Sequence, residues 1–163
     1  MQVSEEVLAE RARWIAALRS GKFERTVGKL EGVAVKVNEH GELMVKTTGF
    51  CCLGVYCMIS GEPREVSVIN DHAVVKYWYN SEYSDSVLPS GLAYVLGLTS
   101  RKGNFYVDDF VVKKVSRFFP IHAHASSSLA ELNDRGVTFD VIADVIEHGP
   151  PGLFTQQKVE TVG

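Results

Sequence analysis

The feature that most constrains this chain is an apolar run near its middle, residues 50–59, which is followed by Ser60 and Gly61. On a helix, its apolar side chains form two stripes that leave no face for water, so we expect a buried helix. At about 11 residues, or roughly 16 Å, this helix is too short to cross a bilayer, which needs about 20 residues. Thr47 and Thr48 are expected to cap its first amides, and Gly61 is expected to end it. The rest of the chain should wrap around this helix.

Composition narrows the class of protein. Of the 163 residues, 45% are apolar and 23% are charged, as in globular domains. The net charge of −3 argues against wholesale binding of nucleic acid. All three cysteines, Cys51, Cys52 and Cys57, lie within or next to the apolar run, and an odd number does not make a disulfide framework. We therefore expect reduced thiols in a cytoplasmic protein, with no secretory signal and no transmembrane segment.

Periodicity and capping residues predict the elements. Apolar residues that alternate with polar ones predict two hairpins, and capped amphipathic stretches predict helices near both ends. Residues 108–119 fit either a helix or a strand, and their β-branched content favours a strand. Residues 80–86 and 120–125 are expected to be loops. The expected strands are 33–37, 43–47, 66–69, 73–79 and 105–107, and the expected helices with their caps are 4–20, 50–61, 90–97, 128–136 and 138–149.

These elements predict an α+β fold. We expect an antiparallel sheet built from hairpins around the buried central helix, with the terminal helices packed on it. Residues 1–149 should form a single globular domain, and residues 150–163 a loose C-terminal tail.

The two C-terminal helices resemble the first two helices of a helix-turn-helix. That motif needs a recognition helix next, but Gly149, Pro150 and Pro151 follow instead. Residues 126–149 also carry five acidic side chains and one arginine, which the phosphates of DNA would repel. We therefore do not expect this element to bind DNA.

Four motifs along the chain match a known family. They are Trp-x-x-Ala-Leu-Arg-Ser-Gly-Lys-aromatic at 14–23, Phe-Cys-Cys-Leu-Gly-Val at 50–55, Leu-Pro…Leu-Gly-Leu at 88–98, and Leu-Ala-Glu-Leu-Asn-Asp-x-Gly-x-x-Phe-x-x-Ile-Ala-Asp-x-Ile-Glu at 129–147. With these motifs the chain resembles a family of small uncharacterised proteins encoded by tailed bacteriophages. The resemblance implies expression in the cytoplasm of an infected bacterium, and it implies no particular activity.

The histidines and serines near residue 125 have the spacing most typical of a ligand-binding or metal-binding site. In an extended segment, His122 and His124 would point to one face and could share a metal or a phosphate, with a third ligand from a distant residue such as Asp108. A plain surface pair is the alternative, and we expect no metal. Ser126 and Ser127 offer hydroxyls and amides to an anion just before a helix. Their alternative role is helix capping, because Ser128-x-x-Glu131 already forms a capping box.

Two further groups of side chains suit an anionic ligand. Arg19, Lys22, Arg25 and Lys29 form a local basic cluster that could attract phosphate, although such a cluster is usually a solvated face. The other group is aromatic. Its members, which could stack on a base or pack in the core, are Tyr77, Trp78 and Tyr79.

These features predict a binding protein. We expect it to sequester a small anionic, nucleotide-derived ligand, such as a signal of bacterial antiviral defence. The alternatives are a hydrolase of such a nucleotide that uses His122 and His124, and an inhibitor that binds a host protein. No serine stands in a strand-elbow motif and no phosphate-binding Gly-rich loop occurs, so we name no catalytic residue and no cofactor. We expect no nucleic-acid or membrane partner, and a homo-oligomer remains open.

Overall fold

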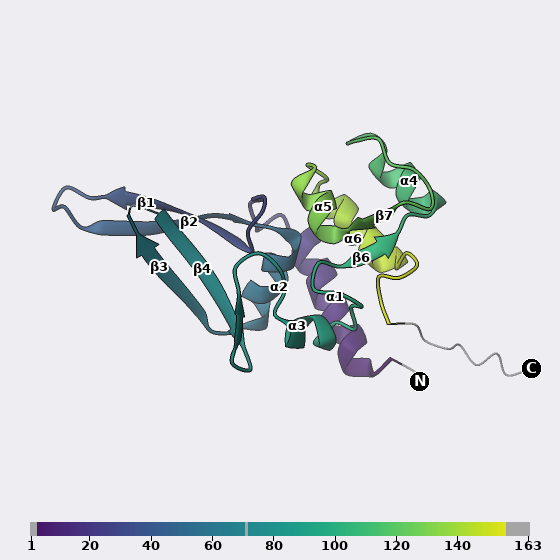
Figure 1. Cartoon of the computed structure of the whole chain (residues 1–163), viewed down its shortest axis with the longest axis horizontal. Helices are drawn as coiled ribbons and strands as arrows, with labels where there is room; N and C mark the ends of the chain where they lie inside the picture. The colour runs from purple at the N-terminus through teal and green to yellow at the C-terminus, as the bar shows by residue number, and fades with distance from the viewer. Residues whose placement is uncertain (1–2, 71, 156–163) are drawn as a thin grey trace, which may run out of the picture.

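Helices and antiparallel strands make up the computed structural model, which describes residues 3–70 and 72–155 (Figure 1). The α+β class expected from the sequence is confirmed. The described elements are α1 (Glu5–Arg19), β1 (Glu31–Val37), β2 (Leu43–Phe50), α2 (Cys52–Ser60), β3 (Arg64–Ile69), β4 (His72–Tyr79), β5 (Glu82–Ser84), α3 (Ser90–Val95), β6 (Asn104–Tyr106), α4 (Asp109–Val115), β7 (Ser126–Ser128), α5 (Leu129–Asp134) and α6 (Phe139–His148).

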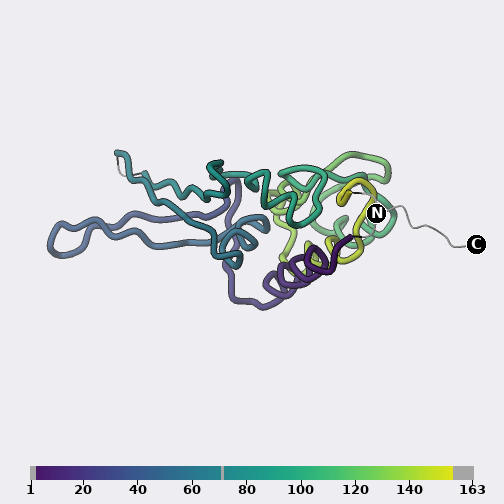
Figure 2. The backbone as a smooth tube through the Cα atoms, turned by 90° about the horizontal axis from the view of Figure 1, so that it is seen from below, coloured from purple at the N-terminus to yellow at the C-terminus, as the bar shows by residue number. Residues whose placement is uncertain are grey.

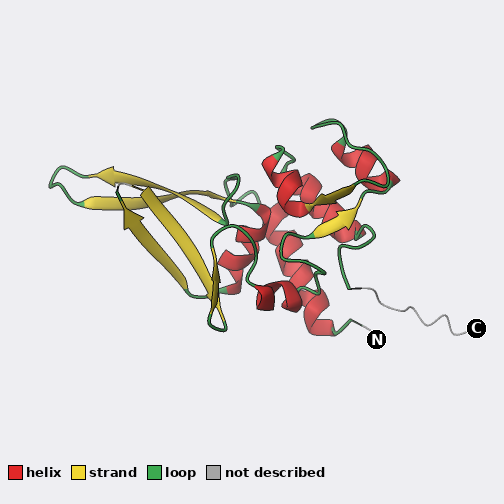
Figure 3. Ribbon diagram, in the orientation of Figure 1, coloured by secondary structure: helices red, strands yellow, loops and turns green. Residues whose placement is uncertain are grey.

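Two long hairpins project from the part of the molecule that contains the helices. The strands β1 and β2 form one sheet, and β3, β4 and β5 form another, so the hairpins do not share the single sheet that we expected. Figure 2 shows that the hairpins separate toward their tips. We call residues 33–48, 64–70 and 72–76 the arm, and the helices with β6 and β7 the body (Figure 3).

The centre of the body is α2. Residues 52–57 of this helix are buried, as expected from the apolar run, and its thiols are free and buried. The backbone of Leu30 lies so close to α2 that a Cβ on Gly54 would stand 1.7 Å from the Leu30 carbonyl oxygen. The indole Nε1 of Trp14, on α1, donates a hydrogen bond to the Cys52 carbonyl at 2.8 Å. Both the helix and its neighbours are therefore held by packing that leaves no room at Gly54.

The ends of α2 differ in part from expectation. Thr47 and Thr48 belong to β2, so they do not cap the helix, and the prediction that they do is wrong. The N-cap is Cys51, whose Sγ accepts a hydrogen bond from the Gly54 amide at 3.3 Å. Gly61 ends the helix with φ of 73°, as expected.

A buried carboxylate joins the two hairpins where they leave the body. Glu31, the first residue of β1, is 1% exposed. It accepts hydrogen bonds from the hydroxyl of Tyr77 at 2.6 Å, from Nη2 of Arg64 at 2.8 Å and from the hydroxyl of Thr47 at 2.7 Å. Burial alone would raise the pKa of Glu31, but these three hydrogen bonds outweigh it and hold that pKa below its usual value.

Residues 109–115 form the helix α4, so the strand expected over 108–119 is wrong. Asp108 caps this helix, because its Oδ1 accepts a hydrogen bond from the Val111 amide at 3.0 Å. Val111 and Val115, one helical turn apart, are both buried. The cap and the buried stripe outweigh the β propensity of the valines.

The C-terminal part of the described chain packs onto the body. Ser128 caps α5, and Gly149 ends α6 with φ of 68°, as expected. The loose tail expected from residue 150 is wrong for residues 150–155, because Leu153 is fully buried and Phe154 lies under the guanidinium of Arg11. Residues 156–163 of that prediction lie outside the described residues.

Candidate functional site

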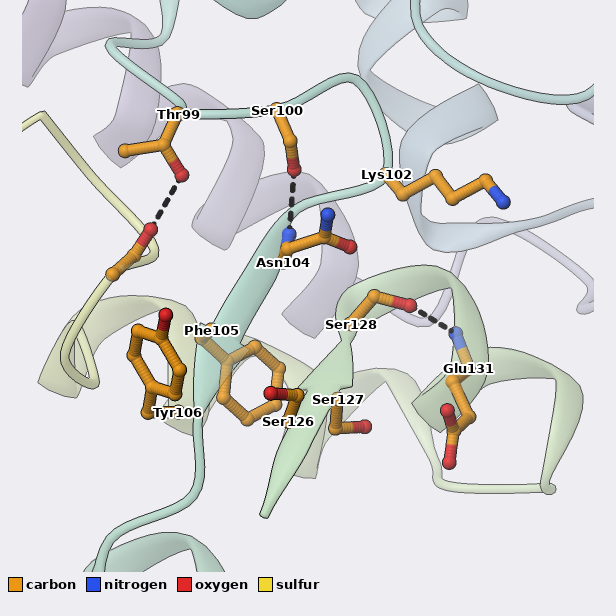
Figure 4. Close-up of a pocket in the computed structure, with 11 residues that line it drawn as sticks. Thr99, Ser100, Lys102, Asn104, Phe105, Tyr106, Ser126, Ser127, Ser128 and Glu131 are labelled. Carbon is orange, nitrogen blue, oxygen red and sulfur yellow. Dashed lines mark hydrogen bonds between the residues drawn. The ribbon is translucent and has the colours of Figure 1, made fainter. Parts of the chain in front are cut away.

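A groove of about 650 Å³ lies beside β6 and β7, in the body (Figure 4). The turn at 99–102 and β6 provide one wall, and β7 with the start of α5 provides the other. The side chains that matter below are Lys102, Asn104, Tyr106, Ser126, Ser127 and Glu131. Two of them, Ser126 and Ser127, are among the ligand-binding residues expected from the sequence.

Strand pairing between distant segments builds this groove. Asn104 pairs with Ser128 and Tyr106 pairs with Ser126 across the antiparallel ladder. Ser126 and Ser127 therefore stand in an antiparallel ladder directly before α5. The turn before β6 lies against the first residue of α5, since the Leu129 amide donates to the Gly103 carbonyl at 2.9 Å.

The two ends of the groove have different chemistry. Figure 4 places the ammonium-bearing side chain of Lys102 and the ring of Tyr106 at opposite ends. Tyr106 is 59% exposed. Its ring lies beside Gly152, where a Cβ would stand 3.1 Å from the ring, so a side chain at that position would displace it. A charged group and an open aromatic face therefore border one polar surface.

Hydroxyl groups cover the floor between these ends. The Ser128 hydroxyl accepts a hydrogen bond from the Glu131 amide at 3.0 Å, and the Ser100 hydroxyl accepts one from the Asn104 amide at 2.7 Å (Figure 4). The Ser127 hydroxyl is buried and has no hydrogen-bond partner among the described residues. The neighbouring Ser126 is exposed and lines the groove.

A second hollow of about 410 Å³ lies on the other side of the same wall, since Lys102, Ser128 and Glu131 line both. The second hollow adds two cationic side chains and one acidic side chain to those of the groove. Together the two hollows have three cationic and two acidic side chains. Cys51 also lines this hollow, but its burial raises the pKa of the thiol to about 11, so it stays protonated at neutral pH. The added charged residues are Lys29, Arg135 and Asp134.

The structure does not bring the expected basic cluster to the groove. Arg19 forms ion pairs with Asp144 at 2.7 Å and Glu147 at 3.0 Å on α6, and its hydrogen bonds to these acids raise its pKa. Arg25 donates to the backbone carbonyl of Asn133 at 2.7 Å. The third member, Lys22, is exposed. Two of the four cations therefore hold the body together, and the fourth, Lys29, lines the second hollow.

The three aromatic residues that were expected to stack on a base instead make packing contacts away from the groove. Tyr77 is fully buried, and its hydroxyl is bonded to Glu31. Trp78 packs against the ring of Tyr83, with 4.9 Å between the ring centroids. The ring of Tyr79 covers Gly91 so closely that a Cβ there would lie 2.2 Å from it. These three residues pack in or beside β4, and none lines either hollow.

The two histidines lie in a turn, not in an extended segment. The Ala125 amide donates to the His122 carbonyl at 3.3 Å, and His124 has φ of 69°. Asp108, which we considered as a third metal ligand, instead contacts His148 Nε2 at 2.7 Å. Within residues 3–70 and 72–155, no three His, Cys, Asp or Glu side chains gather closely enough to hold a metal ion.

Sequence reasoning missed three residues that the structure makes important. Glu31 and Asn133 are buried polar residues. Their hydrogen-bond partners lie at least 16 residues away in the chain, so no local pattern predicts them. The third is Lys102, in the turn between α3 and β6. Two features of the sequence could have indicated this site: Gly103 next to Lys102, and Tyr106 at the other end of the short strand β6. The structure shows that Tyr106 is exposed.

Comparison with known proteins gives a family and no activity. In the part of the chain that the structure describes, no helix has both the length and the apolar character needed to span a membrane. No curated protein and no solved structure matches the chain. Residues 8–149 match the model of a domain of unknown function, DUF8296. Because this match covers most of the 163 residues, the chain belongs to the DUF8296 family.

Proposed function

We propose that this protein binds a small anionic, nucleotide-like ligand in the groove along β6 and β7. The observation that carries the proposal is the placement of the Lys102 ammonium and the exposed Tyr106 ring at opposite ends of one groove. An ammonium pairs with phosphate, and an aromatic ring stacks on a base with about 1–3 kcal/mol. The hydroxyls between them can bond to a sugar or to phosphate oxygens.

The second hollow extends this surface beyond Lys102. It presents Lys29 and Arg135, which suit a second phosphate group. The acids Glu131 and Asp134 limit the net charge there, so a ligand with one or two phosphates fits better than a long polyanion.

Retention of the ligand is better supported than its hydrolysis. The Ser127 hydroxyl has no hydrogen-bond partner among the described residues, so no described base is in position to activate it as a nucleophile. His122 and His124 do not line either hollow. Together with the resemblance to phage proteins, this favours a protein that sequesters an antiviral nucleotide signal in the infected cell.

Isothermal titration with cyclic dinucleotides and ADP-ribose, at low salt, tests the proposal. We expect one of these probes to bind stoichiometrically, and Lys102→Ala and Tyr106→Ala each to weaken binding by about tenfold. Lys113→Ala and Tyr94→Ala are the matched controls, because both residues are exposed on the body and line neither hollow. The controls should bind like the unmodified protein.

Chromatography of the ligand after incubation separates the remaining outcomes. Unchanged ligand supports sequestration, whereas a product that disappears in His122→Ala would replace it with hydrolysis. No heat and no thermal shift with any probe would overturn the proposal. Capture of a host protein by ligand-free protein, with the groove variants unaffected, would favour inhibition of that host protein instead.

A further inference from the structure

The outer edge of β2 is the most unusual surface of the molecule. Among the described residues, β1 is the one strand that pairs with β2, and the opposite edge of β2 carries only an isolated bridge between Arg25 and Phe50 at its body end. All six residues from Leu43 to Thr48 are exposed, which means that both faces of this stretch are in contact with solvent. Leu43, Met44 and Val45 are 54%, 56% and 40% exposed. An open strand edge of this kind is a template for pairing with another strand.

Few of the devices that normally block an open edge occur in this stretch. Residues 43–48 include no proline, and Lys46 is their one charged residue. The irregularity in the hairpin falls between Gly32 and Val33, where Thr48 has no partner on β1, so the bulge lies on β2 at the body end of this stretch and residues 43–47 pair regularly with β1. Proteins usually protect edges with charges, prolines or bulges, and here one lysine and a bulge beyond Thr47 leave residues 43–47 able to pair.

We propose that β2 pairs antiparallel with β2 of a second copy of this chain, about a twofold axis at Met44. In this register Glu42 stands opposite the partner's Lys46, and Leu43 stands opposite the partner's Val45. Because the axis is twofold, each pair occurs twice. Directly opposite side chains in an antiparallel pair lie on the same face, so the ion pairs and the apolar pairs fall on opposite faces of the joined sheet.

Charge on the arm supports a second copy as the partner. Glu42 and Lys46 form no ion pair among the described residues, so both are free to pair across the axis. The residues around the tip of this hairpin carry two lysines and two glutamates and are neutral overall, so two copies do not repel one another. These four charged residues are Lys36, Glu39, Glu42 and Lys46.

This interface is separate from the proposed ligand site. Figure 1 shows β1 and β2 extending away from the body, on the side opposite to β6 and β7. A dimer through β2 therefore leaves both grooves open. Its existence does not depend on the proposed function, and its failure would leave that proposal intact.

Sedimentation velocity over a range of protein concentrations tests the dimer. We expect the unmodified protein to pass from monomer to dimer, and Glu42→Lys and Lys46→Glu each to raise the dissociation constant by about tenfold, because each places like charges opposite one another twice. An equimolar mixture of the two variants should dimerise again, since every opposed pair then joins opposite charges. Lys113→Glu, a charge reversal on α4, is the matched control and should leave the dimer unchanged.

Circular dichroism of each variant establishes that it is folded. A protein that remains monomeric at every concentration would overturn the proposal. So would a dimer that both variants form as readily as the unmodified protein, because that dimer would use another surface. A mixture that stays monomeric would also overturn it, since the register about Met44 predicts that the two variants complement each other. Binding of a host protein's strand by a monomeric chain would assign the edge to that partner instead.

Discussion

The arm and the body are made from the same kinds of residue but use them differently. In the body, α2 has a continuous buried stretch, and its glycine packs directly on the backbone of Leu30. In the arm, Leu43 and Met44 on β2, and Ile69 at the tip of β3, are more than half exposed. Apolar side chains stabilise the body because folding removes them from water. Those of the arm tip gain that stabilisation only from a partner.

A cluster of polar side chains joins the arm to the body. Glu31 is bonded to Arg64, Tyr77 and Thr47, which come from three different strands. Hydrogen bonds are directional, so this cluster sets how the hairpins leave the body, whereas apolar packing alone would allow them to slide. The comparison therefore predicts large effects in the body, intermediate effects at Glu31 and small effects at the arm tip.

The largest effect is expected in the body, for Gly54→Ala. The new Cβ would meet the Leu30 backbone, which has no flexible end to move aside, so we expect a loss of about 3 kcal/mol or more in the free energy of unfolding. Gly41→Ala in the arm turn is the control. Its Cβ would meet no atom within 4 Å, but its φ of 74° costs about 1 kcal/mol. Urea denaturation of both variants measures the difference, and equal losses would contradict the comparison.

The second-largest loss in the free energy of unfolding is expected for Asn133→Ala. The Asn133 side chain accepts from the Cys52 amide at 3.1 Å and donates to the Thr26 carbonyl at 2.7 Å. Its removal leaves the buried Cys52 amide and the part-buried Thr26 carbonyl without these partners, at a cost of about 2–3 kcal/mol. Asn104→Ala, at an exposed position of β6, is the control, and urea denaturation is the measurement. If Asn133→Ala lowers the free energy of unfolding by less than Asn104→Ala does, water has replaced the hydrogen bonds of the Asn133 side chain.

Glu31→Gln should cost less, about 1–2 kcal/mol, because Arg64 is partly exposed and keeps its contact with water. The same variant should change the response to acid. A carboxyl whose pKa is lower in the folded protein stabilises it above the unfolded pKa of about 4.3, and this contribution is lost as pH falls through the folded value. Thermal unfolding from pH 6 to pH 2 should therefore show a shallower decline for Glu31→Gln. An unchanged decline would show that the carboxylate does not link the hairpins in this way.

The smallest effect is expected at the arm tip. Met44→Ser and Ile69→Ser should change the free energy of unfolding of the monomer by no more than about 0.5 kcal/mol, since both side chains are already in water. The measurement is denaturation at a protein concentration where the monomer dominates. A loss of the size seen for Asn133→Ala would show that the tip is part of a core.

The sequence predicts best where local pattern and burial agree. The apolar run marks α2, and the alternation of valines marks β1 and β3, because these signals depend on nearby residues. The strand expected over 108–119 failed because the valines Val111, Val112 and Val115 suit a strand by propensity, while the Asp108 cap and their spacing place them on a helix. Packing around the helix decided between these two local preferences.

The candidate site was less predictable than the fold, for a physical reason. Ser126 and Ser127 were identified, but their groove exists because β7 pairs with β6, which lies about 20 residues earlier in the chain. Arg19 and Arg25 were assigned to a ligand because their charge is visible in the sequence, whereas their partners on α6 and α5 are not. Contacts between distant segments decide which charged groups remain available.

Hydrogen–deuterium exchange at low and at high protein concentration most directly tests the contrast between arm and body. The account predicts that amides of α2 exchange slowly at both concentrations, because they open only with the whole body. Amides of residues 43–48 that face the outer edge of β2 should exchange fast in dilute solution and become protected in concentrated solution, as this edge pairs. Equal exchange of 43–48 at both concentrations, or exchange of α2 as fast as that of the arm, would contradict it.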